Sequence, residues 1–282
     1  MSSWFITGAS RGLGAEIARA ALESGHVVAA TARDPRAVEA LFPDAGDALL
    51  PLPLDVTDEQ QARAAVEAAA KRFGGIDVLV NNAGRGVLGA VEEVSDAAAK
   101  AVYETNVFGT LNVLRAALPG MRARRSGRIL NISSVGGFDS TPGWGVYAST
   151  KFAVEGLSEA LAAEVGPLGI QVTIVEPGRF RTDFLDSSSL HTEATLIEDY
   201  AATAGGTRDT APEHNHNQPG DPAKAARAIV GVAGSDKAPL RLQLGADSVE
   251  RIEAKLHSVA DELERWRSVA VSTDHDDVTA TG

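Results

Sequence analysis

The 282-residue chain contains no cysteine, which excludes both a disulfide framework and thiolate chemistry. It has no run of about 18 consecutive apolar residues, and no basic segment follows its first residues, Met-Ser-Ser. An excess of positive charge is missing too, because the formal net charge is −12. Such a charge argues against general affinity for nucleic acid or anionic membranes. We therefore expect a cytoplasmic protein that binds neither.

The apolar segments of the chain alternate with segments of helical periodicity. Hydrophobic residues make up 44% of the sequence, and the length suits one large α/β domain. Neither an internal repeat nor a linker divides the chain. The pattern predicts an α/β fold with one doubly wound parallel sheet and right-handed crossovers. The expected strands are residues 4–7, 26–31, 49–54, 76–80, 127–132, 171–175 and 240–244.

Tyr147 and Lys151 lie one helical turn apart in the segment Tyr-Ala-Ser-Thr-Lys. Residues at this spacing are neighbours on a helix face. An ammonium group beside a phenol favours the phenolate, so we expect the pKa of Tyr147 to fall below its usual value of roughly 10. Tyr147 is therefore a candidate acid or base. The alternative is a chance pair on a solvated helix.

A glycine-rich turn, Gly8-Ala-Ser-Arg-Gly12-Leu-Gly14, joins the first strand to the first helix. Such a turn lets backbone N–H groups at a helix N-terminus approach a pyrophosphate, whose negative charge the helix dipole favours. The turn thus indicates a dinucleotide site, although a plain tight turn remains the alternative.

The end of the second strand bears on the choice of cofactor. Ala32 stands where NAD-binding folds often place an acidic residue, and Arg33 follows it. A guanidinium group can bind a 2′-phosphate, whereas a carboxylate would repel one, so we expect NADP(H). In the alternative reading Arg33 is solvated and Asp34 caps the next helix.

Polar residues follow the other strands at the same edge of the predicted sheet. Asp55 either accepts a hydrogen bond from an adenine amino group or closes a turn. The segment Asn81-Asn82-Ala83-Gly84 can tie strands together and let a cofactor approach the backbone. Asn106, on the inward side of a helix, either holds a water or is a satisfied core amide. Ser134 ends the fifth strand.

The region between residues 183 and 220 is polar and rich in small residues, which predicts a mobile lid or a functional loop. His214 and His216 lie within it, but no third ligand pattern accompanies them, so we expect no metal site. Aromatic residues on either side either line an apolar pocket or simply pack; they are Phe138, Trp144, Phe180 and Phe184.

From Ser248 the apolar residues recur at alternating steps of three and four, which predicts an amphipathic C-terminal helix. They are Val249, Ile252, Leu256, Val259, Leu263 and Trp266. We expect this stripe to pack on its own domain, with a partner subunit as the alternative. We therefore predict that the chain divides into one domain, residues 1–245, and a C-terminal helix with a polar tail, residues 246–282.

These motifs together, with Pro177-Gly178 added, closely resemble the short-chain dehydrogenase/reductase superfamily over residues 4 to 245. The resemblance implies a Rossmann-type fold whose single domain holds both cofactor and chemistry. It implies catalytic roles for Asn106, Ser134, Tyr147 and Lys151. Cofactor-binding roles are implied for Gly8, Ser10, Arg11, Gly12, Leu13, Gly14, Arg33, Asp55, Val56, Asn82, Ala83, Gly84, Tyr147, Lys151, Pro177, Gly178 and Thr182.

By the same resemblance, Tyr147 donates a proton during NADPH-dependent reduction of a carbonyl to a secondary alcohol, a reversible reaction. Ser134 binds the substrate oxygen, and Lys151 holds the nicotinamide ribose. Asn106 anchors a water in a proton relay. The partner expected is a small carbonyl or alcohol, with a homodimer left open and a tetramer made doubtful by the C-terminal helix. An epimerase, a dehydratase and a non-catalytic nucleotide-sensing module remain alternatives.

Overall fold

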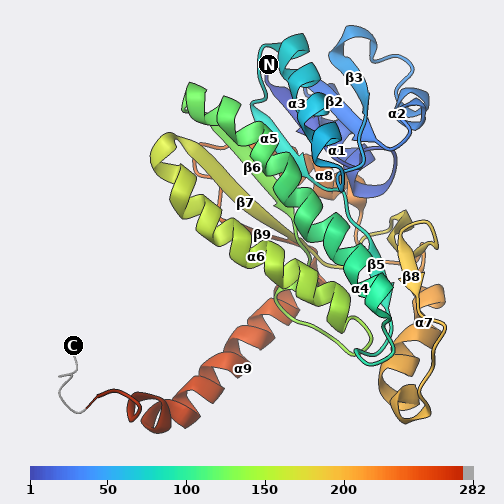
Figure 1. Cartoon of the computed structure of the whole chain (residues 1–282), viewed down its shortest axis with the longest axis vertical. Coiled ribbons are helices and arrows are strands. Elements are labelled where there is room, and N and C mark those ends of the chain that lie inside the picture. Colours follow the sequence, from blue (N-terminus) through green and yellow to red (C-terminus); the bar gives the residue numbers. More distant parts are fainter. Residues whose placement is uncertain (276–282) are drawn as a thin grey trace.

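A computed structural model describes residues 1–275 of the chain. Its centre is a seven-stranded sheet in the order β3-β2-β1-β4-β6-β7-β9, in which every neighbouring pair is parallel (Figure 1). The strands are β1 Ser3–Ile6, β2 Val27–Ala32, β3 Leu49–Pro53, β4 Val78–Asn81, β6 Gly127–Ile132, β7 Ile170–Pro177 and β9 Arg241–Leu244. The predicted doubly wound Rossmann-type sheet is confirmed.

The position of each strand follows from its composition. Strand β3 contains Pro51 and Pro53 and lies at the edge of the sheet, where a missing backbone N–H costs little. The inner strands are apolar on both faces because helices cover both faces. Phe5 and Leu79, on β1 and β4, are completely buried.

Two layers of helices enclose the sheet (Figure 1). One core, on the side of α1 and α8, also includes Val38 from α2. The opposite core contains residues of α3, α5 and α6. The helices are α1 Gly12–Glu23, α2 Arg36–Leu41, α3 Glu59–Phe73, α4 Asp96–Tyr103, α5 Gly109–Arg124, α6 Gly145–Val165 and α8 Pro222–Ala233.

Short helical turns complete the described chain. Two are π-helical, η2 Glu104–Phe108 between α4 and α5, and η7 Ala201–Gly205. The others are 3₁₀ turns: η1 Gly46–Ala48, η3 Val135–Gly137, η4 Gly166–Leu168, η5 Asp183–Leu185 and η6 Glu198–Tyr200.

The segment from 183 to 220, predicted as a mobile lid or a functional loop, contains regular secondary structure. It forms a strand, β8 Leu190–Thr192, which pairs with β5 Gly86–Leu88, and a helix, α7 Gly206–His214. The buried carboxylate of Glu93 accepts hydrogen bonds from the Ile197 N–H (2.9 Å) and from Arg208 Nη1 (2.9 Å). This carboxylate fastens the polar segment to the body of the protein, a contact that local sequence does not encode.

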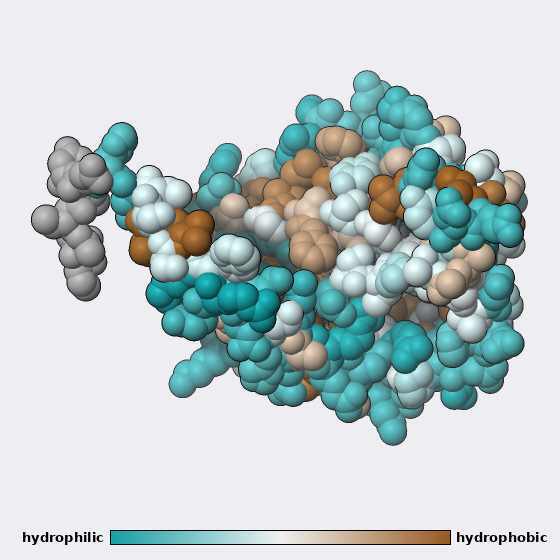
Figure 2. All heavy atoms as spheres, turned by 90° about the horizontal axis from the view of Figure 1, so that it is seen from below, coloured by the Kyte–Doolittle hydropathy of each residue, from teal (hydrophilic) through white to brown (hydrophobic). Residues whose placement is uncertain are grey.

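The last helix, α9 Ala246–Val271, projects away from the body (Figure 1). The expectation that its apolar stripe packs on its own domain is wrong for most of its length. Ile252 is buried, but Leu256, Val259 and Leu263 are exposed, because the body ends beneath the first turns of the helix. Figure 2 shows apolar atoms at the surface of this arm. Within residues 1–275, no helix has the length and apolar character needed to cross a membrane.

Candidate active site

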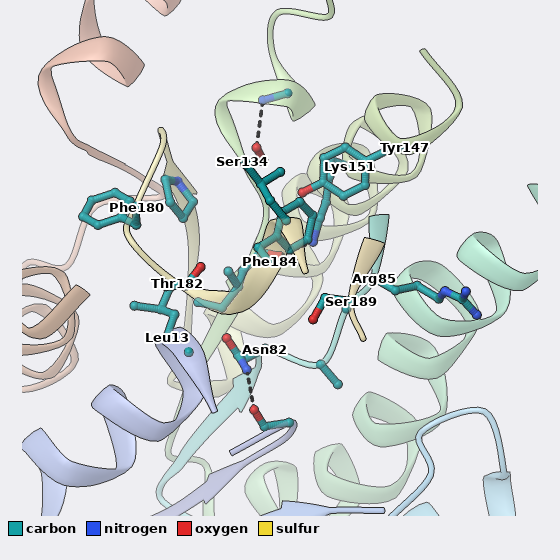
Figure 3. A pocket seen from close by; sticks show the side chains of 18 of the residues that line it. Leu13, Asn82, Arg85, Ser134, Tyr147, Lys151, Phe180, Thr182, Phe184 and Ser189 are labelled. Carbon is teal, nitrogen blue, oxygen red and sulfur yellow. Dashed lines mark hydrogen bonds between the residues drawn. The ribbon is translucent and has the colours of Figure 1, made fainter. Parts of the chain in front are cut away.

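One cavity of about 1230 Å³ lies at the carboxyl edge of the sheet (Figure 3). The glycine-rich turn, the ends of several strands and the first turns of α6 line it. Of the residues predicted to bind cofactor or to act in catalysis, only Gly14 and Asn106 are not among its lining residues. The fold therefore brings into one place residues that are more than 170 positions apart in the chain.

The glycine turn has the geometry that a bound pyrophosphate requires. Gly8 and Gly12 have φ angles of 66° and 54°, in the left-handed region that favours glycine. A Cβ at Gly14 would overlap Asn82 Nδ2 and the carbonyl oxygen of Gly8. Only glycine therefore fits at position 14. Helix α1 begins at Gly12, so the N–H groups of its N-terminus face the edge of the cavity. The turn fits a dinucleotide.

A network centred on Thr7 holds this turn in place. Thr7 Oγ1 accepts hydrogen bonds from the N–H groups of Asn82 (3.0 Å) and Ala83 (2.9 Å). In return, Asn82 Nδ2 donates to the carbonyl oxygens of Thr7 (2.9 Å) and Gly8 (3.0 Å). The structural role considered for the asparagine segment is thus present. Sequence reasoning missed Thr7 as a site residue, although it directly precedes the glycine turn.

The end of β2 presents Arg33 to the cavity as an exposed side chain. The adjacent Asp34 is paired with Arg36, whose Nε donates to Asp34 Oδ1 at 2.9 Å. This hydrogen bond lowers the pKa of the Asp34 carboxyl, so it stays ionised with its charge partly balanced by Arg36. The nearby acid therefore offers less repulsion to a 2′-phosphate than the sequence suggests.

Asp55 also lines the cavity, but one of its oxygens is already engaged. Oδ1 accepts hydrogen bonds from the N–H (3.0 Å) and the hydroxyl (2.7 Å) of Thr57. The turn-forming role considered for Asp55 is therefore observed, and the adenine contact stays a prediction.

Tyr147 lies in the first turns of α6 with 8% of its surface exposed. Burial raises its pKa to about 12, and a hydrogen bond with Ser134 acts in the opposite direction. The expectation that this pKa falls below its usual value is wrong for the protein without ligands, because desolvation of the phenolate outweighs the neighbouring groups. At neutral pH Tyr147 carries the proton that a donor needs.

Lys151 is buried one turn later on α6, and its Nζ donates to the carbonyl oxygen of Ile132 at 2.9 Å. Nζ is 5.9 Å from the centre of the Tyr147 ring. Burial lowers the pKa of Lys151 to about 8, and the negative charge of Glu155 opposes this shift. The ammonium group is thus held at the cavity wall beside Tyr147 and Ser134 (Figure 3).

Asn106 lies in the π-helical turn η2 and is 1% exposed. Its Oδ1 accepts from the Arg85 N–H (2.9 Å), and its Nδ2 donates to the Arg85 carbonyl (3.0 Å) and to Thr150 Oγ1 (2.9 Å). A Cβ at Gly84 would contact both Asn106 Oδ1 (3.3 Å) and Lys151 Nζ (3.7 Å). The core-amide alternative is therefore satisfied, while the water-holding role stays a prediction.

Two further predicted cofactor residues, Arg11 and Thr182, bring the glycine turn and the segment after β7 together. Arg11 Nη2 donates to the Ser188 carbonyl (2.9 Å) and to Ser189 Oγ (2.8 Å), so it fastens the segment after β7 to the turn. Thr182 lies opposite Gly12, whose added Cβ would contact the Thr182 side chain at 3.5 Å. The cofactor contact predicted for Arg11 would have to compete with these hydrogen bonds.

The other end of the cavity is aromatic. The Phe184 ring lies 5.4 Å from the Tyr147 ring and 6.4 Å from that of Trp144, measured between centroids. Phe180 also lines the cavity, whereas Phe138 is not among its lining residues and lies against Arg241 instead. Other lining residues were not predicted as site residues, among them Thr207, Thr210, Gln218 and Arg251, and His214 was considered only as a metal ligand.

One cluster of metal-ligating groups occurs among the described residues. Oxygen atoms of Asp183 and Asp186 and a ring nitrogen of His216 lie within 4.8 Å of one another. Asp186 Oδ1 already accepts a hydrogen bond from Asn215 Nδ2 (2.6 Å) and is 3.3 Å from His216 Nε2. These contacts bring the Asp186 and His216 side chains together.

Comparisons with known proteins agree with this geometry. The family model described as "short chain dehydrogenase" matches residues 3–193. A curated relative, a 3-ketodihydrosphingosine reductase of Bacteroides thetaiotaomicron, is 39% identical over 240 residues, which cover 85% of this chain and 86% of the relative.

Two solved structures extend the comparison to the fold. A short-chain dehydrogenase from Streptomyces avermitilis has 43% sequence identity and a TM-score of 0.90, covering 97% of this chain and all of its own. ElxO with NADP bound has 27% identity and a TM-score of 0.73, covering 89% of this chain and all of its own.

Proposed function

This chain belongs to the short-chain dehydrogenase/reductase superfamily and is an oxidoreductase of that type, and on this premise we propose that it is an NADPH-dependent carbonyl reductase. The observation that carries the proposal is the position of Tyr147, Ser134 and Lys151 around the same cavity as the glycine turn. The reaction is reversible, so the same site oxidises a secondary alcohol.

Each residue of the site has a defined task in the reduction. A bound nicotinamide supplies the hydride, with its electron pair, to the carbonyl carbon. Tyr147 transfers its phenolic proton to the carbonyl oxygen, which completes the alcohol. Ser134 donates a hydrogen bond to the same oxygen as negative charge develops on it.

The remaining two residues act on these groups. Lys151 holds the nicotinamide ribose and, as a cation, stabilises the tyrosinate that is left after proton transfer. Asn106 anchors a water that returns a proton by way of Lys151. The buried position of Tyr147 keeps its proton in place until a substrate accepts it.

NADP(H) is the cofactor that the end of β2 favours. Arg33 lines the cavity there, and Arg36 partly balances the charge of Asp34. The NADP bound to ElxO, a structural neighbour, supports the same choice. The 3-keto substrate named for the Bacteroides relative, together with the aromatic end of the cavity, supports an apolar ketone.

The proposal extends to the organisation of the chain. Residues 1–245 carry the cofactor site and the chemistry, and the C-terminal extension that begins at residue 246 contributes one residue, Arg251, to the lining of the cavity. We place the protein in the cytoplasm, as a homodimer.

A titration with NADPH and with NADH, at one fixed salt concentration, tests the cofactor. We expect NADPH to bind at least tenfold more tightly, a difference of about 1.4 kcal/mol, and Arg33→Ser to remove most of that difference. Arg63→Ser, an exposed arginine on α3 paired with Glu59, is the matched control. Equal binding of the two cofactors would overturn the NADP(H) assignment.

A panel of ketones, aldehydes and alcohols, assayed by the change in cofactor absorbance, tests the reaction. Oxidation of NADPH with a carbonyl substrate supports the proposal. Tight binding without turnover on the whole panel would favour a nucleotide-sensing module. A product formed without net cofactor oxidation would favour an epimerase or a dehydratase.

A further inference from the structure

The base of α9 is held firmly by the body of the protein. Ser248 Oγ donates to the Glu176 carbonyl oxygen (2.8 Å), and Arg251 Nε donates to Asp139 Oδ2 (3.0 Å). Ile252 is 5% exposed. These contacts fix the direction in which the helix leaves the body, so residues 253–271 form a preorganised arm (Figure 1).

The arm carries a row of large apolar side chains that no described residue covers. Leu256, Val259, Leu263 and Trp266 are 53%, 47%, 57% and 60% exposed. They continue from Ile252 in alternating steps of four and three, the spacing of a coiled-coil seam. We call these four residues the α9 seam. At this spacing the four residues lie on one side of the helix.

Such a row on a fixed helix indicates an interaction surface. Among the described residues, none packs against these four side chains. A second molecule with an apolar row of its own would remove them from water.

The charges of the arm disfavour a membrane or a nucleic acid as the occupant of the seam. Interfacial helices that bind anionic lipids are rich in lysine and arginine on their polar face. The arm has four acidic residues and three basic ones instead: Glu253, Asp261, Glu262 and Glu264, and Lys255, Arg265 and Arg267. This near balance lets two arms approach each other although each chain carries a net charge of −12.

The residues that flank the seam are complementary to a second copy of the same helix. In a heptad with Leu256 and Leu263 at position a, Lys255 and Glu262 occupy position g and Arg267 occupies position e. A parallel pair sets Glu262 against Arg267 of the partner subunit, and an antiparallel pair sets Lys255 against Glu262 of the partner subunit. The parallel orientation joins opposite charges on both sides of the seam, and the antiparallel orientation joins them on the side of the g positions.

We propose that the α9 seam is a homodimer interface, in which α9 of one subunit packs against α9 of a second copy of this chain. The interface lies outside the catalytic cavity and does not depend on the reaction that the enzyme performs. It gives a role to an apolar stripe that the fold of a single subunit leaves in solvent.

Light scattering coupled to size exclusion tests the proposal with the full chain at tens of micromolar. The wild type should show twice the chain mass of 29.3 kDa. Leu256→Glu with Leu263→Glu should reduce this to the mass of one chain. Ala254→Glu with Ser268→Glu adds the same charge on the opposite side of the helix and should remain dimeric.

Two results would overturn the proposal: a monomeric wild type, or an unchanged mass for the seam variant. Circular dichroism melting of the seam variant shows whether its subunits remain folded, which is expected because its substitutions lie beyond the anchored base. Sedimentation with vesicles of phosphatidylcholine and phosphatidylglycerol tests whether the seam binds a lipid membrane instead. Capture of a monomeric wild type on them would contradict the dimer.

The absence of native cysteine makes a cross-linking test specific. Under mild oxidation, Val259→Cys alone should form a disulfide dimer if the helices are parallel and in register. If they are antiparallel, Leu256→Cys combined with Val259→Cys should cross-link and Val259→Cys alone should not. Asp261→Cys, on the opposite side, is the control. The proposal fails if neither seam variant cross-links beyond this control.

Discussion

Helices α6 and α9 break the usual rule of burial in opposite directions. Helix α6 buries a polar row, in which Tyr147, Lys151 and Glu155 are 8%, 6% and 6% exposed. Helix α9 exposes an apolar row, in which Leu263 and Trp266 are 57% and 60% exposed. Buried charges and large exposed apolar groups are both costly, so each departure indicates a function. The first faces the reacting atoms, and the second faces another molecule.

Two members of the polar row of α6 have polar or charged neighbours within the subunit. Lys151 donates to the Ile132 carbonyl oxygen, and Glu155 lies 3.3 Å from Arg241 Nε, although neither carboxylate oxygen of Glu155 accepts a hydrogen bond. The exposed apolar row of α9 has no neighbour of its own kind among the described residues. Contacts within the subunit thus distinguish the active-site helix from the docking helix.

Removing the charge from the buried row should have the largest effect. Lys151→Met keeps the length of the side chain but loses the ammonium group, so we expect kcat/KM to fall on the order of 10³-fold. Lys100→Met, an exposed lysine on α4 paired with Asp96, is the control and should stay within twofold of wild type. Steady-state kinetics measure both variants. A kcat/KM of Lys151→Met within a few-fold of the wild-type value would contradict a catalytic role for the buried row.

Two apolar truncations on α9 compare its base with its arm. Ile252→Ala creates a cavity in packed structure and should lower the free energy of unfolding by about 2–5 kcal/mol. Leu263→Ala, at a protein concentration low enough for monomers, should change it by less than about 1 kcal/mol. Urea denaturation measures both. Equal losses would show that the arm packs on its own subunit.

The buried carboxylate of the polar row should make stability depend on pH. Burial raises the pKa of Glu155 to about 7, above its unfolded value of roughly 4.3. The folded state therefore holds the proton more tightly, and its stability falls as pH rises from roughly 4.3 to 7. Glu155→Gln cannot ionise, so its melting temperature relative to wild type should rise by a few degrees, about 3–6 °C, between pH 5 and pH 8.

Glu159→Gln provides the matched control for this pH effect. Glu159 also pairs with Arg241, but its side chain is 53% exposed, so its melting curve should follow that of wild type at every pH. Calorimetric scans at several pH values test both variants. If the melting temperatures of Glu155→Gln and wild type changed equally with pH, the Glu155 carboxylate would not be the cause of the pH dependence.

The sequence predicts the sheet well because each strand carries its own signal. Apolar runs bounded by turn residues located all seven strands of the main sheet, and Pro51 and Pro53 located its edge. The strand and helix that follow residue 183 were not predicted. The fold of this segment depends on a hydrogen bond to Glu93, a residue about a hundred positions away in the chain. Local composition cannot report such a contact.

The candidate site shows the same division. The residues of the glycine turn could be predicted, since the backbone there requires glycine. The pKa of Tyr147 could not, because it depends first on burial, with the Trp144 and Phe184 rings packed against Tyr147, and then on a hydrogen bond with Ser134. For α9 the periodicity predicted the helix, but only the end of the body beneath Ile252 determines which residues stay exposed.

Proton donation by Tyr147 is tested most directly by two variants, each of which removes the hydroxyl group of one tyrosine. Tyr147→Phe removes the proposed proton donor. Tyr103→Phe, on α4, removes a hydroxyl that donates to Ser149 Oγ, and Ser149 lies on α6 as Tyr147 does. With a carbonyl substrate and NADPH, we predict that kcat falls on the order of 10²–10⁴-fold for Tyr147→Phe and less than twofold for Tyr103→Phe, with NADPH affinity retained in both. Turnover by Tyr147→Phe close to that of wild type would contradict the account.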